Sequence, residues 1–183
     1  MELSFIRSTF KQGSLLGIGF CIYTMLMWAT KLDSTYLIIG QYINMVTAVF
    51  PLIIILWAIR QENDSGGVSI IDRIGIAVFV GLISFTIYEP FLFVYHHFIN
   101  PNWFDFVLNL KENELRASEA SQEYIIDVLM SMKKLNLSQS GLFQPSAAIV
   151  SVIVIPMISA LLSLIFIKTK RVVSPRIELG SKV

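Results

Sequence analysis

Four long apolar runs constrain the fold of this sequence more than any other feature. They cover Ser14–Thr30, Tyr36–Ile59, Ile74–Phe98 and Pro145–Ile167. At a rise of about 1.5 Å per residue, a helix over each run approaches the roughly 30 Å thickness of a bilayer's hydrocarbon core. A soluble chain of 183 residues would have almost no polar shell left after burying four such helices. We therefore expect an all-α integral membrane protein built as a four-helix bundle.

The composition supports this interpretation and excludes several classes. The chain is 55% hydrophobic and 15% charged, against roughly 45–50% and 25% in soluble proteins. Too little remains outside the runs for a separate soluble core, so residues 1–183 are expected to form a single membrane domain. The net charge of +1 gives no reason to expect nucleic acid. The single Cys21 cannot form an internal disulfide.

The distribution of Lys and Arg predicts the orientation. The first run is longer than a secretory signal's apolar region and lacks a small-x-small cleavage site, so we interpret it as a retained helix. With cytoplasmic termini, nine bases lie inside and five outside, and four of those five lie in the insert between the third and fourth runs. The inner bases are Arg7, Lys11, Arg60, Arg73, Lys168, Lys170, Arg171, Arg176 and Lys182. We therefore predict a multi-pass membrane protein with both termini cytoplasmic and a frayed tail after Lys170.

The insert, about residues 100–136, is expected to be helical and extracytoplasmic. Asn100 is predicted to be an N-cap, with Pro101 at the first helical position. A break is expected near Ser118–Ser121, followed by an apolar stripe from Tyr124 to Leu135. The insert would thus form one bent or two short amphipathic helices, over the bundle mouth or flat on the membrane. Six acids against four bases favour docking on protein over anionic lipid.

Two motifs carry a family resemblance. The first is Gly66-Gly67-Val68-Ser69-Ile70 before the third run, and the second is Tyr95-His96-His97-Phe98-Ile99-Asn100-Pro101 leading into the insert. With a fourth run that ends in lysines, the chain resembles domain of unknown function 4199, a family of small four-helix bacterial inner-membrane proteins, from about Gly13 to Lys170. The resemblance implies no catalytic roles, because the family has no established activity. The Glu89-Pro90 pair is not part of the pattern.

Glu89 is the sharpest candidate functional residue because a carboxylate in hydrocarbon is costly. Pro90 removes a backbone donor and weakens the helix there. His96 lies seven residues beyond Glu89 with His97 beside it, so Glu89 and His96 could relay protons. The alternative, which we favour, places the histidines at the interface and pairs a protonated Glu89 with Asn44 or a serine in a packed bundle.

Metal and catalytic chemistry find little support in the sequence. Adjacent histidines point about 100° apart on a helix, so His96 and His97 would not easily share an ion, and no metal or cofactor is expected. There is no Gly-x-Ser-x-Gly motif and no phosphate-binding loop. Pairs of small residues four positions apart instead predict close packing between helices. These pairs are Gly13/Gly17, Ala77/Gly81, Ala147/Ser151 and Ser159/Ser163. In the second run, Pro51 predicts a kink.

Three functions remain open from the sequence. The first is a non-enzymatic assembly or accessory subunit of the cell envelope, which would bind another envelope membrane protein or itself, with the lipid bilayer as its surroundings. The second is a small oligomeric transporter or channel that uses Glu89 and His96. The third is an enzyme acting on a lipid-linked substrate through His96, His97 and Asp105.

Overall fold

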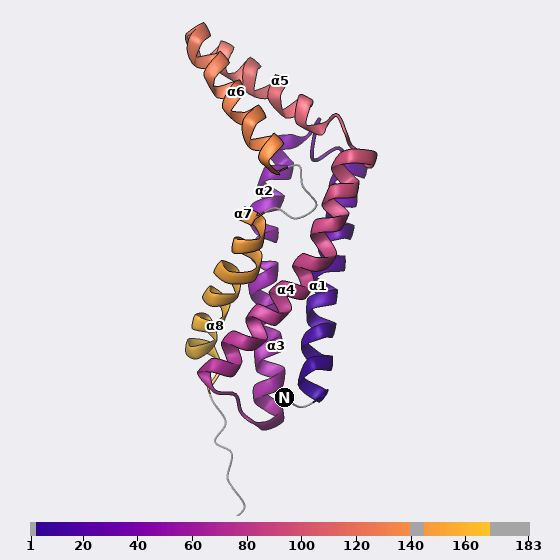
Figure 1. The fold of residues 1–183 in the computed structure, drawn as a ribbon, viewed down its shortest axis with the longest axis vertical. Coiled ribbons are helices and arrows are strands. Elements are labelled where there is room, and N and C mark those ends of the chain that lie inside the picture. The colour runs from indigo at the N-terminus through magenta and orange to yellow at the C-terminus, as the bar shows by residue number, and fades with distance from the viewer. Residues whose placement is uncertain (1–2, 140–144, 169–183) are drawn as a thin grey trace, which may run out of the picture.

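The protein is a helical membrane bundle with a helical insert. The computed structural model describes residues 3–139 and 145–168, and every element within these ranges is a helix. In this described part, four segments are long and apolar enough to span a membrane: Ile6–Ala29, Leu37–Gly66, Ile70–Ile99 and Pro145–Phe166. They run lengthwise together (Figure 1). The predicted all-α multi-pass architecture is confirmed. The predicted frayed tail, with Lys170, Arg171, Arg176 and Lys182, lies outside the described residues.

Helix α1 (Leu3–Ala29) packs along α4 (Ile70–Val94) through glycine notches. A Cβ on Gly13 would lie 2.7 Å from the Cβ of Ile83, and one on Gly17 would lie 2.9 Å from the Cβ of Ile87. Without a hydrophobic drive between helices in lipid, such close backbone approach supplies van der Waals contact. The predicted Gly-x-x-x-Gly interface is thus confirmed, and α4 is its partner.

The second span consists of two helices, α2 (Leu37–Thr47) and α3 (Phe50–Gly66). The break at Ala48 and Val49 precedes Pro51, which lacks the N–H that a continuous helix would need. The predicted kink is therefore confirmed as an interruption. Most of α2 is exposed, with Ile38 and Met45 each 72% accessible, whereas α3 packs against α4 and α8.

The turn from α3 to α4 has strong local signals. Gly67 ends α3 at φ 79°, a left-handed conformation that favours glycine. Ser69 then begins α4 with a capping box: its Oγ accepts from the Asp72 N–H at 3.2 Å, and an Asp72 carboxylate oxygen accepts from the Ser69 N–H at 3.0 Å. The first resemblance motif therefore encodes a helix stop followed by a helix start.

The fourth span is α7 (Pro145–Ala148), a π-helical segment η2 (Ile149–Val154) and α8 (Ile155–Phe166). The sequence does not predict the π segment, which ends two residues before Pro156, where the α-helical hydrogen-bond ladder lacks a donor. Gly81 of α4 fits against this span. A Cβ there would lie 2.5 Å from the Ser151 carbonyl oxygen and 2.9 Å from Pro156 Cγ.

Arg73 holds the end of α8. Its side chain is fully buried at 1% exposure, although the sequence suggested a loop base. One guanidinium nitrogen donates to the Ser163 carbonyl at 2.7 Å, and the other donates to the Ile167 carbonyl at 2.9 Å. These carbonyls belong to the C-terminal end of α8, where the helix dipole favours a cation. The Ser163 carbonyl also accepts from the Ile167 N–H at 2.8 Å, so Arg73 adds a second donor to it.

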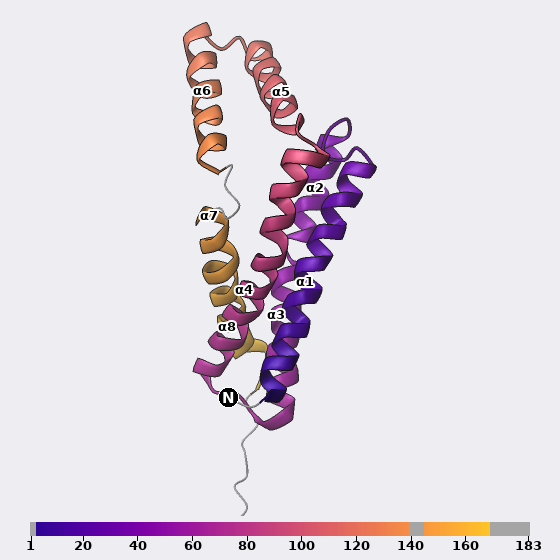
Figure 2. The same cartoon turned by 45° about the vertical axis from the view of Figure 1, so that its right-hand side comes forward.

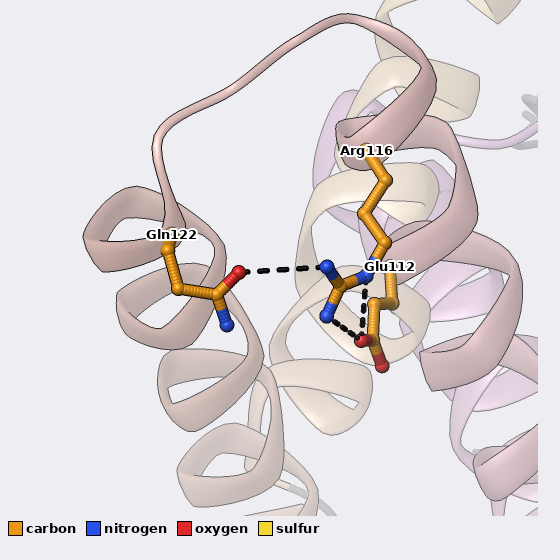
Figure 3. A network of polar contacts seen from close by, with 3 residues as sticks. All are labelled: Glu112, Arg116 and Gln122. Atoms are coloured by element: carbon orange, nitrogen blue, oxygen red, sulfur yellow. Dashed lines mark hydrogen bonds and ion pairs between the residues drawn. The ribbon is translucent and has the colours of Figure 1, made fainter.

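The insert is a hairpin of α5 (Trp103–Ala117) and α6 (Gln122–Gln139). Its turn is the part farthest from the spanning helices, so it stands away from the bundle and does not lie flat on it (Figures 1 and 2). Leu108, Leu115 and Ile125 are buried in it. Arg116 joins the two helices, with Nη2 2.7 Å from Glu112 Oε1 and Nη1 3.5 Å from Gln122 Oε1 (Figure 3).

The predicted break in the insert is confirmed, but the predicted cap at its start is wrong. Ser121 Oγ accepts from the Tyr124 N–H at 3.3 Å, as the fresh cap requires. Helix α5 begins at Trp103 after Asn102, so Asn100 and Pro101 precede it. The Asn100 side chain has other partners, which are described next.

Candidate functional site at the insert end of the bundle

The loop between α1 and α2 forms one side of the site. Lys31 reverses the chain at φ 59°, and the Leu32 N–H donates back to the Met27 carbonyl at 2.9 Å. The Leu32 carbonyl then packs against Gly40 of α2, where a Cβ would lie only 1.9 Å from its oxygen. Because glycine alone fits there, α2 holds the loop and its next residue, Asp33, against the bundle.

A π turn at the end of α4 forms the other side. Segment η1 (Tyr95–Ile99) continues α4, and the Asn100 N–H donates to the Tyr95 carbonyl at 2.8 Å, five residues back. The wider turn brings these two residues together, and Asn100 Nδ2 donates to Tyr95 Oη at 3.0 Å. The π turn thereby aligns two side chains that an ordinary α-helix would separate.

Asp33 joins the two sides. Its Oδ2 accepts from Tyr95 Oη at 2.6 Å and from Asn100 Nδ2 at 3.0 Å. Hydrogen bonds to a carboxylate are short and stronger than neutral ones, and Tyr95 is only 3% exposed. We call Asp33, Tyr95 and Asn100 the Asp33 clasp. It fixes the α1–α2 loop to the base of the insert.

An open cleft of about 630 Å³ lies beside the clasp. It combines aromatic side chains with amides, hydroxyls, one carboxylate and one ammonium group. Its lining residues are Trp28, Ala29, Lys31, Asp33, Ser34, Thr35, Asn100, Asn102, Trp103 and Phe106. Aromatic walls with a few polar groups are typical of sites for polar organic ligands.

The two histidines of the π turn have different surroundings, and His96 is the one that contacts a residue of the cleft. His96 is half-buried, 5.0 Å from the Tyr95 ring and 5.2 Å from the Trp103 ring, measured between centroids. His97 is exposed and stacks on Phe93 at 4.1 Å, with its Nδ1 2.8 Å from the Phe93 carbonyl oxygen. Among the residues that the structure describes, no group of three or more His, Cys, Asp or Glu is placed to hold a metal ion.

Glu89, Pro90 and Asn44 lie apart from the clasp. Glu89 is buried at 4% exposure, and α4 continues through Pro90 to Val94 before the π turn begins. Seven helical residues place His96 about 10 Å farther along the axis, beyond the reach of a direct hydrogen bond to Glu89. Asn44 Oδ1 accepts from Tyr23 Oη of α1 at 2.5 Å, so Asn44 links α2 to α1.

The sequence of this chain matches a known protein family over most of its length. Residues 11–168 match the model of the family described as "Protein of unknown function (DUF4199)". The chain belongs to this family. No curated protein and no solved structure matches it.

In this DUF4199 chain, the second resemblance motif has a structural explanation. Tyr95 and Asn100, its first and sixth residues, are the two donors of the Asp33 clasp. Pro101 follows directly, and α5 begins two residues later. The motif therefore encodes the π turn and the junction from the bundle to the insert.

Two polar residues of this DUF4199 member have structural roles that no motif in the sequence predicts. Asp33 lies in the short loop between the first two spans, next to the base Lys31 and Leu32. An acid between two spans, with a tyrosine and an asparagine at the same end of the bundle, is the signal that could indicate the clasp. The sequence predicts Arg73 only as a loop base, and nothing local indicates that its side chain turns inward to α8.

Proposed function

We propose that the protein is a non-enzymatic accessory or assembly subunit of the bacterial cell envelope. Its α5–α6 hairpin docks an extracytoplasmic segment of an envelope membrane protein. The proposal has the protein in the inner membrane with both termini cytoplasmic. The orientation rests on the sequence, in which nine of the fourteen Lys and Arg belong to the terminal segments and the segment between the second and third apolar runs.

One observation carries the proposal: the hairpin has an exposed apolar face beyond the membrane-spanning segments. Tyr124, Ile126 and Met130 of α6 are 56%, 46% and 61% exposed. With Glu123 and Asp127 they line a shallow groove of about 530 Å³. Apolar side chains exposed to water and rimmed by charge are typical of protein interaction sites.

The charge of this groove defines the partner. Glu123 and Asp127 are exposed acids, and the hairpin stands away from the lipid-facing bundle. An acidic groove repels anionic headgroups and favours a segment with apolar and basic side chains. The Asp33 clasp supports the proposal because it fixes the base of the hairpin relative to the membrane.

Site-specific photocrosslinking in cells tests this function. A photoreactive residue at Ile126 should give one defined adduct, which Glu123→Lys together with Asp127→Lys should remove. Leu110 of α5 is the matched control, because it is apolar and 43% exposed but outside the groove. The same adducts at both positions, or none at Ile126, would overturn the proposal. An adduct at twice the chain mass would assign the groove to self-association instead.

Ion or proton translocation is the second candidate, and the buried Glu89 is the observation that favours it. A carboxylate at 4% exposure inside the span Ile70–Ile99 is typical of transport pathways. Proton flux into proteoliposomes is the measurement, with Glu89→Gln as the variant and Glu112→Gln on the insert as the control. Equal flux in Glu89→Gln and the wild type would remove this candidate.

A further inference from the structure

A second groove lies at the opposite end of the bundle, beside the α3–α4 turn. It has a volume of about 560 Å³ and is formed by the last turns of α3 and the end of α8. Arg60 and Lys168 supply two cations to it, and Trp57 and Phe166 supply apolar walls. Asp64 also lines the groove, so its net charge is positive by one.

The chain fixes this groove through two side chains that hold α8. Asn63 Nδ2 donates to the Lys168 carbonyl at 3.1 Å, and Arg73 donates to the carbonyls of Ser163 and Ile167. These contacts place the backbone of Lys168 against α3, one turn from Arg60. The two cations are therefore brought to one site from helices more than a hundred residues apart in sequence.

A buried asparagine shapes the floor of the groove. Asn63 is 3% exposed, and its Nδ2 donates to the Lys168 carbonyl, so this side chain holds the end of the fourth span against α3. Its Oδ1 has almost no accessible surface and therefore lies behind the groove wall. The groups of the groove that a ligand can reach are the charged and aromatic side chains.

The position of the groove identifies the ligand class. Trp57 is 50% exposed and Phe166 is 72% exposed at the end of the spanning segments, where aromatic side chains meet lipid headgroups. Basic pockets between membrane helices bind anionic headgroups, and the neighbouring apolar surface receives the acyl chains. Arg and Lys both bind phosphate well, with Arg forming paired hydrogen bonds.

We propose that this groove binds one anionic phospholipid, such as phosphatidylglycerol. The phosphate lies between Arg60 and Lys168. The acyl chains lie along Trp57 and Phe166. Asp64, which also lines the groove, disfavours headgroups of higher negative charge.

Quenching of Trp57 fluorescence tests this lipid site directly. The chain has three tryptophans, so Trp28→Phe and Trp103→Phe leave Trp57 as the only one. The full chain is reconstituted into phosphatidylcholine vesicles with small fractions of phosphatidylglycerol brominated on its chains. We expect quenching above that given by the same fraction of brominated phosphatidylcholine. Arg60→Gln with Lys168→Gln should lower the relative association constant by up to about 30-fold, or roughly fivefold per base.

Matched variants separate this site from general charge attraction. Arg7→Gln with Lys11→Gln removes the same charge from exposed positions at the same end, on α1, and should retain the excess quenching. Free glycerol 3-phosphate should not abolish it, because the apolar walls contribute to binding the lipid. The proposal is overturned by any of three results: no excess in the wild type, equal loss in both double variants, or full competition by glycerol 3-phosphate, which would indicate a site for free phosphate.

Discussion

Asp33 is the residue whose removal should most disturb the insert end. Asp33→Ala leaves the buried Tyr95 hydroxyl and the Asn100 amide without their shared acceptor, at a cost of about 1–3 kcal/mol in the free energy of unfolding. Tyr95→Phe removes one donor of the same network, so the double variant should lose less than the sum of the single losses. Chemical unfolding in detergent micelles measures the free energy of unfolding of the two single variants and of the double variant. Thr35→Ala, exposed in the same loop, is the control. Additive losses would contradict the clasp.

Arg73 should behave as a structural residue and not as a surface base. Arg73→Leu removes the donors to the Ser163 and Ile167 carbonyls at the end of α8 and should destabilise the protein by about 1–3 kcal/mol. Arg73→Lys keeps the charge but cannot reach both carbonyls with one ammonium group, so it should restore only part of the loss. The measurement is the same unfolding experiment, with Arg7→Leu as the exposed control. Full stability in Arg73→Leu would show that α8 is held by apolar packing alone.

Contact between elements can be tested with two glycines of one helix. Gly17 faces α4, where an added Cβ would lie 2.9 Å from Ile87 Cβ, whereas Gly19 has no atom within 4 Å of such a Cβ. Replacing glycine by alanine inside a helix favours folding by up to about 1 kcal/mol from propensity alone. Gly19→Ala should therefore be neutral or stabilising, and Gly17→Ala destabilising because α1 and α4 are forced apart. Thermal unfolding in detergent compares the two. Equal shifts would argue against close α1–α4 packing.

The elements differ in how far the sequence predicts them. Spans follow from hydropathy, because backbone groups in lipid must be satisfied within a helix, and Pro51 and Gly67 mark their interruptions through local chemistry. The π turns are less predictable: η2 lies before Pro156 and η1 lies within the second resemblance motif, but neither feature by itself distinguishes a π turn from a kink or a helix end. The clasp and the Arg73 contacts join residues 62 and 90 positions apart, and no pattern along the chain pairs them. The N-cap predicted at Asn100 failed for the same reason, since its side chain binds Asp33.

The two ends of the whole molecule differ in the kind of site that each presents. The insert end has the Asp33 clasp, the aromatic cleft and the acidic hairpin. The other end has Arg60, Lys168 and the groove that we assign to phospholipid. A docking role for the hairpin requires it to lie outside the cytoplasm, and a lipid groove requires its end to lie at a headgroup layer. Both proposals therefore depend on the four spans crossing the bilayer fully.

The orientation of the molecule is testable with single cysteines. The chain has one cysteine, Cys21 in α1, so Cys21→Ser gives a cysteine-free background. Loops rich in Lys and Arg stay in the cytoplasm, which would place the α5–α6 hairpin outside. Asn113→Cys in α5 should therefore react with a membrane-impermeant maleimide in right-side-out vesicles. Ser65→Cys at the end of α3 should react only in inside-out vesicles, and both positions are exposed, so burial does not bias the comparison. The reverse pattern would place the hairpin in the cytoplasm and remove an extracytoplasmic partner. Labelling of both cysteines from the same side would contradict an odd number of spans between them and therefore the path of α4 across the membrane.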